Sequence, residues 1–197
     1  MKGLLVVAGL LLGAAPAYAR DDSSTIEAIW LRQVVNFVYQ ADTTFYTCSS
    51  LRQKIAGMLS YVGARAAGPL RGVRCDDFAG TVRMQIAFES PAAATAENVR
   101  AMTDHDTEDL LVARLRGERL ATPEDITRFP AAWATRSLRE SGMELTGADC
   151  ELVQQLRRQV LPKLAVEVIK EPSRCTSVLS RSSTMPNMKV RALLVAG

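Results

Sequence analysis

The sequence predicts an α+β fold, in which two strand–helix–strand–strand units form one mostly antiparallel sheet with helices packed on it. Two similar stretches, residues 46–75 and 147–175, carry this prediction. In each stretch a cysteine opens an amphipathic helix, a short apolar strand follows, and an Arg-Cys pair ends the stretch. A further strand is predicted after each Arg-Cys pair. We therefore expect pseudo-repeats over about residues 33–89 and 131–196, joined by a helical insertion over about residues 98–129.

The two cysteine helices share a spacing of apolar residues. Counted from the cysteine, apolar residues stand 3, 10, 11 and 14 positions further on in both helices. These residues are Leu51, Met58, Leu59 and Val62 after Cys48, and Val153, Val160, Leu161 and Leu164 after Cys150. Amphipathic helices share such stripes by chance, so the repeated distance from the cysteine to the Arg-Cys pair is the stronger sign of duplication.

A helix and a strand are predicted before the first cysteine. Ser24 and Glu27 have the spacing of a capping box, which favours a helix at residues 23–31. Alternating apolar residues then favour a strand over residues 33–40, with one long helix over the whole segment as the alternative.

The first half continues with a helix and two strands. Ser49 or Ser50 can cap a helix that runs to about Val62, and Gly63 can terminate it. The strands that follow are predicted at residues 69–75 and 81–89.

The insertion is predicted to be mainly helical. Residues 90–98 are rich in Ala and contain Pro91, which favours a surface loop. Residues 106–119 form an amphipathic pattern with acids in the first turn and bases in the last, as the helix dipole favours. A short helix is expected to start at Thr122, where Pro123 suits the first helical position.

The second half repeats the plan of the first. Asp149 is the expected cap of its helix, and Pro162 ends or bends that helix. The predicted elements are a strand at residues 131–138, a helix at 150–161 and strands at 165–169 and 188–196.

The first 19 residues have the pattern of a secretory signal peptide. Lys2 is followed by an apolar run and by the small-residue site Ala17-Tyr18-Ala19. The run is short for a membrane span and charged residues follow at once, so we expect cleavage after Ala19 and no transmembrane segment in the product. The expected product, residues 20–197, is a single domain in the periplasm or secreted.

The four cysteines are expected to form two disulfides, because an exported chain meets an oxidising compartment. A helix of about 14 residues is about 21 Å long, and a strand of about six residues returns over about 20 Å. The second cysteine of each half therefore comes back beside the start of the helix. This geometry predicts the pairs Cys48–Cys75 and Cys150–Cys175 over the two other connectivities.

Three short motifs resemble a family of small exported bacterial proteins to which no activity is assigned. They are Tyr46-Thr47-Cys48-Ser49-Ser50-Leu51, Gly63-Ala64-Arg65 and Asp149-Cys150-Glu151-Leu152-Val153. The resemblance implies an exported protein and carries no catalytic role over to any residue.

Two places could hold a metal ion. Asp104, His105 and Asp106 form a cluster with a single histidine, but acids are favoured at a helix start in any case. Met185 and Met188 could offer two thioethers to Cu(I), although methionine also packs well in cores. Neither place has the ligand number of an established metal site, so we predict no cofactor.

The sequence favours a non-enzymatic binding protein over an enzyme. There is no GxSxG motif, and the lone His105 would have to serve any Ser–His pair. The chain has 24 basic and 21 acidic residues, and this near balance argues against nucleic-acid binding. We expect the partner to be an envelope protein or a small ligand. The alternative is a metal-handling protein or hydrolase that uses the acidic cluster around His105.

Overall fold

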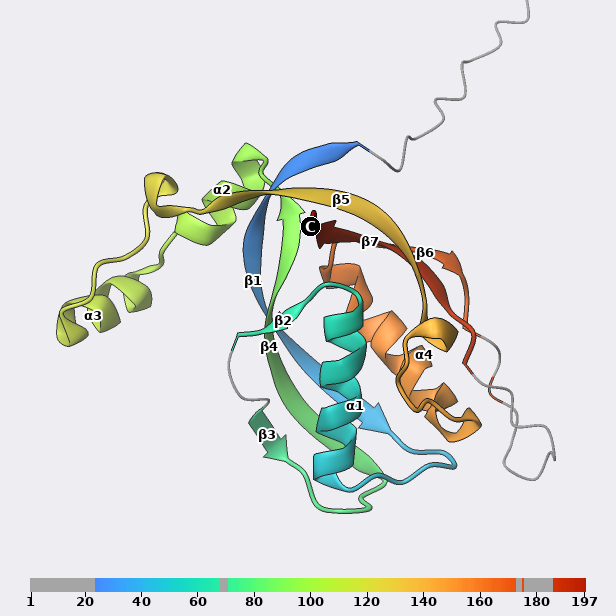
Figure 1. Cartoon of the computed structure of the whole chain (residues 1–197). Coiled ribbons are helices and arrows are strands. Elements are labelled where there is room, and N and C mark those ends of the chain that lie inside the picture. The colour runs from blue at the N-terminus through green and yellow to red at the C-terminus, as the bar shows by residue number, and fades with distance from the viewer. Residues whose placement is uncertain (1–23, 68–70, 173–174, 176–185) are drawn as a thin grey trace, which may run out of the picture.

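The computed structural model describes residues 24–67, 71–172, 175 and 186–197 (Figure 1). The described residues form one antiparallel sheet of seven strands. The strands are β1 (Thr25–Gln40), β2 (Arg65–Ala66), β3 (Arg71–Arg74), β4 (Thr81–Ala93), β5 (Arg128–Ser137), β6 (Val166–Lys170) and β7 (Lys189–Val195). The helices are α1 (Cys48–Tyr61), α2 (Ala96–Thr103), α3 (Thr107–Arg116) and α4 (Cys150–Gln159). Short 3₁₀ turns lie at Pro123–Asp125, Leu138–Glu140, Gly147–Asp149 and Leu161–Lys163.

The two halves have similar connectivity, and the predicted α+β class is confirmed. In the first half, β4 lies between β1 and the short strands β2 and β3; in the second half, β7 lies between β5 and β6. The first half therefore runs strand, helix, two short strands, strand, and the second half runs strand, helix, strand, strand. In both halves the last strand lies in the middle of its group. The halves meet where the first residues of β1 pair with β5. The duplication itself stays a prediction, because shared connectivity does not show common descent.

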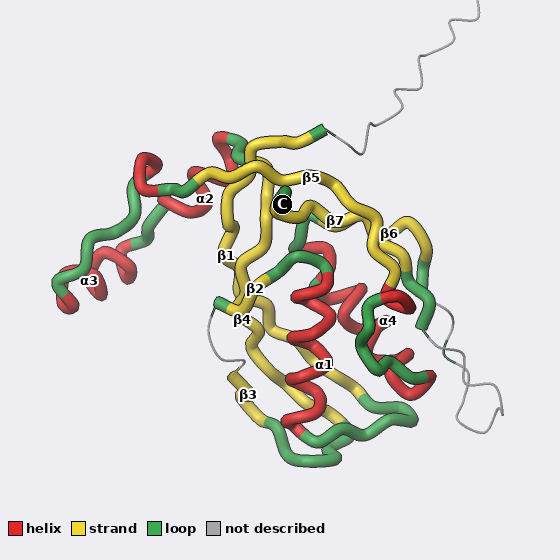
Figure 2. The backbone as a smooth tube through the Cα atoms, viewed as in Figure 1, coloured by secondary structure: helices red, strands yellow, loops and turns green. Residues whose placement is uncertain are grey.

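Helices α1 and α4 cover the same side of the sheet, and the main core lies between them and the strands (Figure 2). The inward side chains of β1 and β4 alternate along each strand, as a half-buried antiparallel pair requires. The most deeply buried contributors include Phe37, Tyr39, Leu51, Ile55, Ile86, Phe88 and Leu152. The apolar stripes seen in the sequence of both helices thus face one common core.

The predicted helix at residues 23–31 is wrong, because β1 runs without a break from Thr25 to Gln40. Its residues from Ala28 onward pair with β4, and residues 25–29 also pair with β5. Every residue from Thr25 to Leu31 therefore pairs with at least one strand, and Ala28 and Ile29 pair with two. The hydrogen bonds of these ladders outweigh a local capping signal.

The predicted loop at residues 90–98 is also wrong. β4 continues to Ala93 through Pro91, which lies opposite Trp30 of β1. The other neighbour of β4 there, β2, pairs only with Phe88 and Glu89, so Pro91 lies where β4 has one neighbouring strand and tolerates a residue without an N–H. Helix α2 then begins at once, with Thr95 as its cap.

Two glutamines of α4 take the place of a neighbouring strand beside the end of β1. The side-chain amide of Gln159 accepts from the N–H of Val38 at 2.9 Å and donates to its C=O at 2.8 Å. Gln155 makes the same pair of bonds with Gln40, at 2.8 and 2.6 Å. Because β5 pairs only with residues 25–29 of β1, these amides satisfy backbone groups that no strand reaches.

We expect the double substitution Gln155→Ala/Gln159→Ala to lower the free energy of unfolding by about 2 kcal/mol. Four hydrogen bonds are lost, and the solvent replaces part of them. The uncovered edge should also make the protein more prone to aggregate. Urea denaturation and light scattering check this, with the exposed Gln53→Ala as the control. A double variant as stable as the control contradicts the assigned role of the two amides.

Gly63 terminates α1 as predicted, and it also fits closely against the second half. Its φ is +90°, and a Cβ there would lie 3.1 Å from the carbonyl oxygen of Leu193 and 2.5 Å from Cδ2 of Leu194. The Leu194 side chain can move aside, but the backbone oxygen of β7 cannot move without disturbing the sheet. Glycine is therefore required both by the backbone conformation and by the approach of β7.

We expect Gly63→Ala to lower the free energy of unfolding by about 2–3 kcal/mol, from backbone strain plus overpacking. Gly117→Ala is the matched control: its φ is +66°, and its added Cβ would meet no atom within 4 Å. Thermal and urea denaturation of both variants separate strain from packing. Equal losses in the two variants would show that the contact with β7 is unimportant.

Candidate functional site

The predicted cluster around His105 lies in the connection between α2 and α3. The side chain of Asp106 caps α3 by accepting from the N–H of Asp109 at 2.8 Å, and Asp109 returns the bond in a capping box. The Nε2 atom of His105 donates to the carbonyl oxygen of Ala121 at 3.0 Å. Among the described residues, no group of three His, Cys, Asp or Glu side chains could hold a metal ion. These contacts cap α3 and hold the connection between α2 and α3 against the chain that follows α3.

The two methionines proposed for Cu(I) have different surroundings. Met185 lies outside the described residues. Met188 is buried and packs in the main core, against residues that include Leu138 and Leu156. Its thioether therefore contributes to packing, the alternative noted from the sequence.

The predicted cysteine pairs are both present, and each joins the start of a helix to the chain after the next strand. The Cα atoms lie 5.8 Å apart in Cys48–Cys75 and 5.5 Å apart in Cys150–Cys175. The first pair is reinforced by Asp77, whose carboxylate accepts from the N–H of Cys48 at 2.8 Å. Two disulfides fit an oxidising compartment. Within the described residues no helix is both long and apolar enough to cross a membrane.

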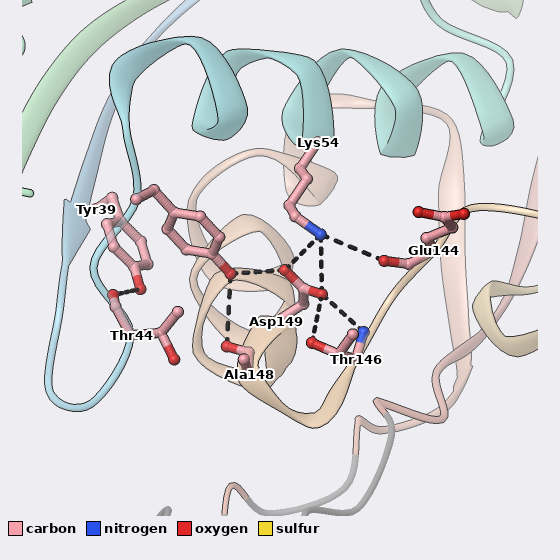
Figure 3. A network of polar contacts seen from close by, with 8 residues as sticks. Tyr39, Thr44, Lys54, Glu144, Thr146, Ala148 and Asp149 are labelled. Carbon is pink, nitrogen blue, oxygen red and sulfur yellow. Dashed lines mark hydrogen bonds and ion pairs between the residues drawn. The ribbon is translucent and has the colours of Figure 1, made fainter. Parts of the chain in front are cut away.

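A buried polar network joins the two halves of the molecule (Figure 3). Asp149 is 1% exposed and lies at its centre. Its carboxylate accepts from the Tyr46 hydroxyl at 2.7 Å, from Lys54 Nζ at 3.0 Å and from the Thr146 N–H at 2.7 Å. Tyr46 and Lys54 belong to the first half and Thr146 to the second. The network therefore connects α1 to the segment that leads into α4.

A second carboxylate, that of Glu151 in α4, binds the loop that follows β1. Glu151 accepts from the N–H of Thr43 at 3.0 Å and of Asp42 at 3.2 Å, and from the Tyr39 hydroxyl at 3.4 Å. Burial alone would raise the pKa of Glu151, but the hydrogen bonds from the Thr43 side chain and the loop backbone outweigh it and lower the pKa. Glu151 thus holds this loop against α4 as a carboxylate.

The same balance holds at Asp149, where burial acts to raise the pKa. The hydrogen bonds from the Thr146 backbone, Tyr46 and Lys54 outweigh burial, and the net pKa is lowered. Burial and the neighbouring carboxylates raise the pKa of Tyr39 and of Tyr46. At neutral pH the acids are charged and the tyrosines are protonated. None of these groups is poised for proton transfer near pH 7, so the network acts as a structural joint.

A shallow groove of about 530 Å³ lies beside this joint, between α1 and the residues before Thr146. Its lining includes Ser50, Gln53, Lys54, Met143 and Glu144. The ammonium of Lys54 is held by Asp149 and by the Glu144 carbonyl oxygen at 3.3 Å, so this charge already serves the fold.

The most unusual surface is on the insertion, which projects from the sheet as an arm with α3 at its outer end (Figures 1 and 2). Four apolar side chains of α3 are exposed, by 55%, 55%, 36% and 86%: Leu110, Leu111, Val112 and Leu115. We call them the α3 apolar surface. A hollow of about 590 Å³, lined in part by Leu110, Leu111 and Leu120, adjoins it. Only Ala113 of the helix is buried.

The sequence located α3 correctly but could not show that its apolar side is exposed. An amphipathic pattern normally indicates a helix that packs on the core. Here α3 begins at the capping box of Asp106 and ends at Gly117, which has the left-handed conformation. The helix lies beyond the sheet. The available signal was a leucine-rich helix inside the insertion that joins the two halves.

Comparisons with models of protein families, with curated proteins and with solved structures find no match. The resemblance to small exported bacterial proteins stays a prediction, and the functional argument depends on the surfaces of this molecule.

Proposed function

We propose that this is an exported, non-enzymatic interaction protein of the periplasm or the extracellular space, and that its binding surface is the α3 apolar surface. The observation that carries the proposal is the exposure of Leu110, Leu111 and Leu115 on a helix that extends beyond the sheet. Soluble proteins seldom expose a contiguous group of large apolar side chains, and where they do, the group commonly marks a contact with another molecule.

The rest of the described structure acts as a support that holds this arm in place. Each disulfide fixes one half internally, and the Asp149 joint connects the two halves. At the foot of the arm, Arg119 pairs with Asp125 at 2.6 Å, and His105 bonds to Ala121 on the returning chain. These contacts orient α3 without burying its leucines.

The experiment is chemical cross-linking in intact cells that make the tagged protein. We expect Leu111→Glu/Leu115→Glu to abolish the cross-linked species seen with the wild type, because charges replace the centre of the α3 apolar surface. Val34→Glu/Ile169→Glu is the matched control, since Val34 and Ile169 are each 55% exposed and lie on strands. Unchanged species in the α3 variant, with circular dichroism showing an intact fold, would refute the proposal.

A further inference from the structure

We infer that the partner of the α3 apolar surface is a second copy of this chain, which binds through its own α3 in antiparallel orientation. This inference rests on the proposed function, because it takes α3 to be the binding surface. The identity of the partner is inferred from the distribution of charge along α3.

The charges of α3 are separated by sign along its length. The first turn carries Glu108 and Asp109, and the last turn carries Arg114 and Arg116. Two copies related by a twofold axis through the middle of α3 have antiparallel helices. The start of the α3 apolar surface on each copy then contacts the end of the same surface on the other copy. The acids of each copy would lie beside the arginines of the other, and the two helix dipoles would oppose each other favourably.

The apolar side chains have the spacing that such a pair needs. Leu111 and Leu115 stand one turn apart, and Val112 lies beside Leu115, three positions before it. Asp109 and Arg116 are two turns apart, and both lie beside the apolar side chains, on the side where Val112 lies. In an antiparallel pair of helices, this side of one copy faces the same side of the other copy. Each copy would thus place Asp109 beside Arg116 of the other copy, once at each end of the contact.

The alternatives are less well matched to these residues. An anionic membrane surface attracts helices with a basic polar face, whereas α3 carries two acids and two arginines. A parallel pair of copies would place Glu108 against Glu108 and Arg116 against Arg116. A ten-residue helix offers less than the roughly 800 Å² per partner of a stable interface, so the dimer should be weak and reversible.

The test is sedimentation velocity on the purified protein over a range of concentrations, up to about 300 µM because the contact is small. We expect wild-type protein to form dimers and Leu111→Glu/Leu115→Glu to stay monomeric. Asp109→Arg alone and Arg116→Glu alone should each weaken dimerisation by at least about tenfold, because the two Asp109–Arg116 pairs become repulsive. Glu97→Arg, an exposed first-turn acid of α2, is the control for the helix-end charge and should dimerise normally.

An equimolar mixture of the two single variants provides the decisive measurement. One copy then carries only arginines at positions 109 and 116 and the other only carboxylates, so the mixed dimer regains two attractive pairs and should form much more tightly than either single variant alone. Single variants that dimerise like wild type would refute the antiparallel arrangement. A mixture that stays monomeric would refute the contact.

Failure of this inference is distinguishable from failure of the proposed function. Wild-type protein that is monomeric at the highest concentration refutes self-association. Loss of cross-linked species in Leu111→Glu/Leu115→Glu would then still support an interaction surface with another partner. Binding of the monomer to phosphatidylglycerol vesicles, without dimers, would also overturn the inference.

Discussion

Replacing Asp149 with alanine should lower the free energy of unfolding by about 3–5 kcal/mol. The substitution removes the carboxylate that accepts from the Tyr46 hydroxyl and the Lys54 ammonium, and it leaves Lys54 with the Glu144 carbonyl oxygen at 3.3 Å. It also removes the capping box with Thr146 that starts the turn before α4. Breaking a buried charge pair from one side is costly because the remaining partner stays desolvated. Urea denaturation monitored by circular dichroism gives the difference directly.

Tyr46→Phe is the graded control, since it removes a single hydrogen bond and should cost about 1 kcal/mol. In Lys54→Met/Asp149→Ala the unpaired ammonium is also absent, so this double variant should be less destabilised than the sum of the two single variants. Additive losses would show that Lys54 and Asp149 are not coupled, and the joint between the halves would need another explanation.

The lowered pKa values of Asp149 and Glu151 predict a loss of stability in acid. Their ordinary values are 3.8 and 4.5, and both are lower in the folded protein. The charged forms therefore stabilise the fold fully above these ordinary values, and this contribution is lost as the pH falls through the folded values. In Asp149→Asn the decline of unfolding free energy below about pH 4 should be shallower than in wild type. Equal slopes would assign the acid sensitivity to other groups.

Removing either disulfide should have an effect of similar size. The bridges span 27 residues in Cys48–Cys75 and 25 in Cys150–Cys175. Chain-entropy models assign a loop of this length roughly 3.5 kcal/mol, through the restriction of the unfolded chain. We expect Cys48→Ala/Cys75→Ala and Cys150→Ala/Cys175→Ala each to lose about this much stability.

Loss of both bridges should bring the protein close to the threshold of folding, because single domains have a net stability of about 5–15 kcal/mol. Urea denaturation of the two double variants and the quadruple variant, with and without reductant, measures each contribution. Reductant should destabilise wild type and leave the quadruple variant unchanged. A loss below about 1 kcal/mol for either pair would contradict a stapling role.

Several features could be predicted from local pattern alone. The α+β class, both cysteine pairs and helices α1, α3 and α4 follow from apolar spacing and helix-end residues. These signals are local, because one turn of helix or one alternation of side chains is encoded by neighbouring residues. The cysteine pairing followed because a helix and a returning strand have nearly the same length.

The errors arose where distant segments decide the structure. Residues 25–31 became strand because each of them pairs with β4, with β5 or with both, and Pro91 was accepted because β4 has one neighbour at that point. The candidate metal residue His105 instead bonds to Ala121, sixteen positions away. None of these partners is visible in the local sequence.

The sequence by itself therefore determined the α+β class, the two disulfides and the presence of a leucine-rich helix in the insertion. Only the tertiary structure decided that Asp149 links α1 to α4, that Gln155 and Gln159 cover the end of β1, and that the leucines of α3 face outward. The physical reason is that a side-chain pattern specifies which face of an element is apolar. What covers that face, another element or a second molecule, depends on the arrangement of the whole chain in space.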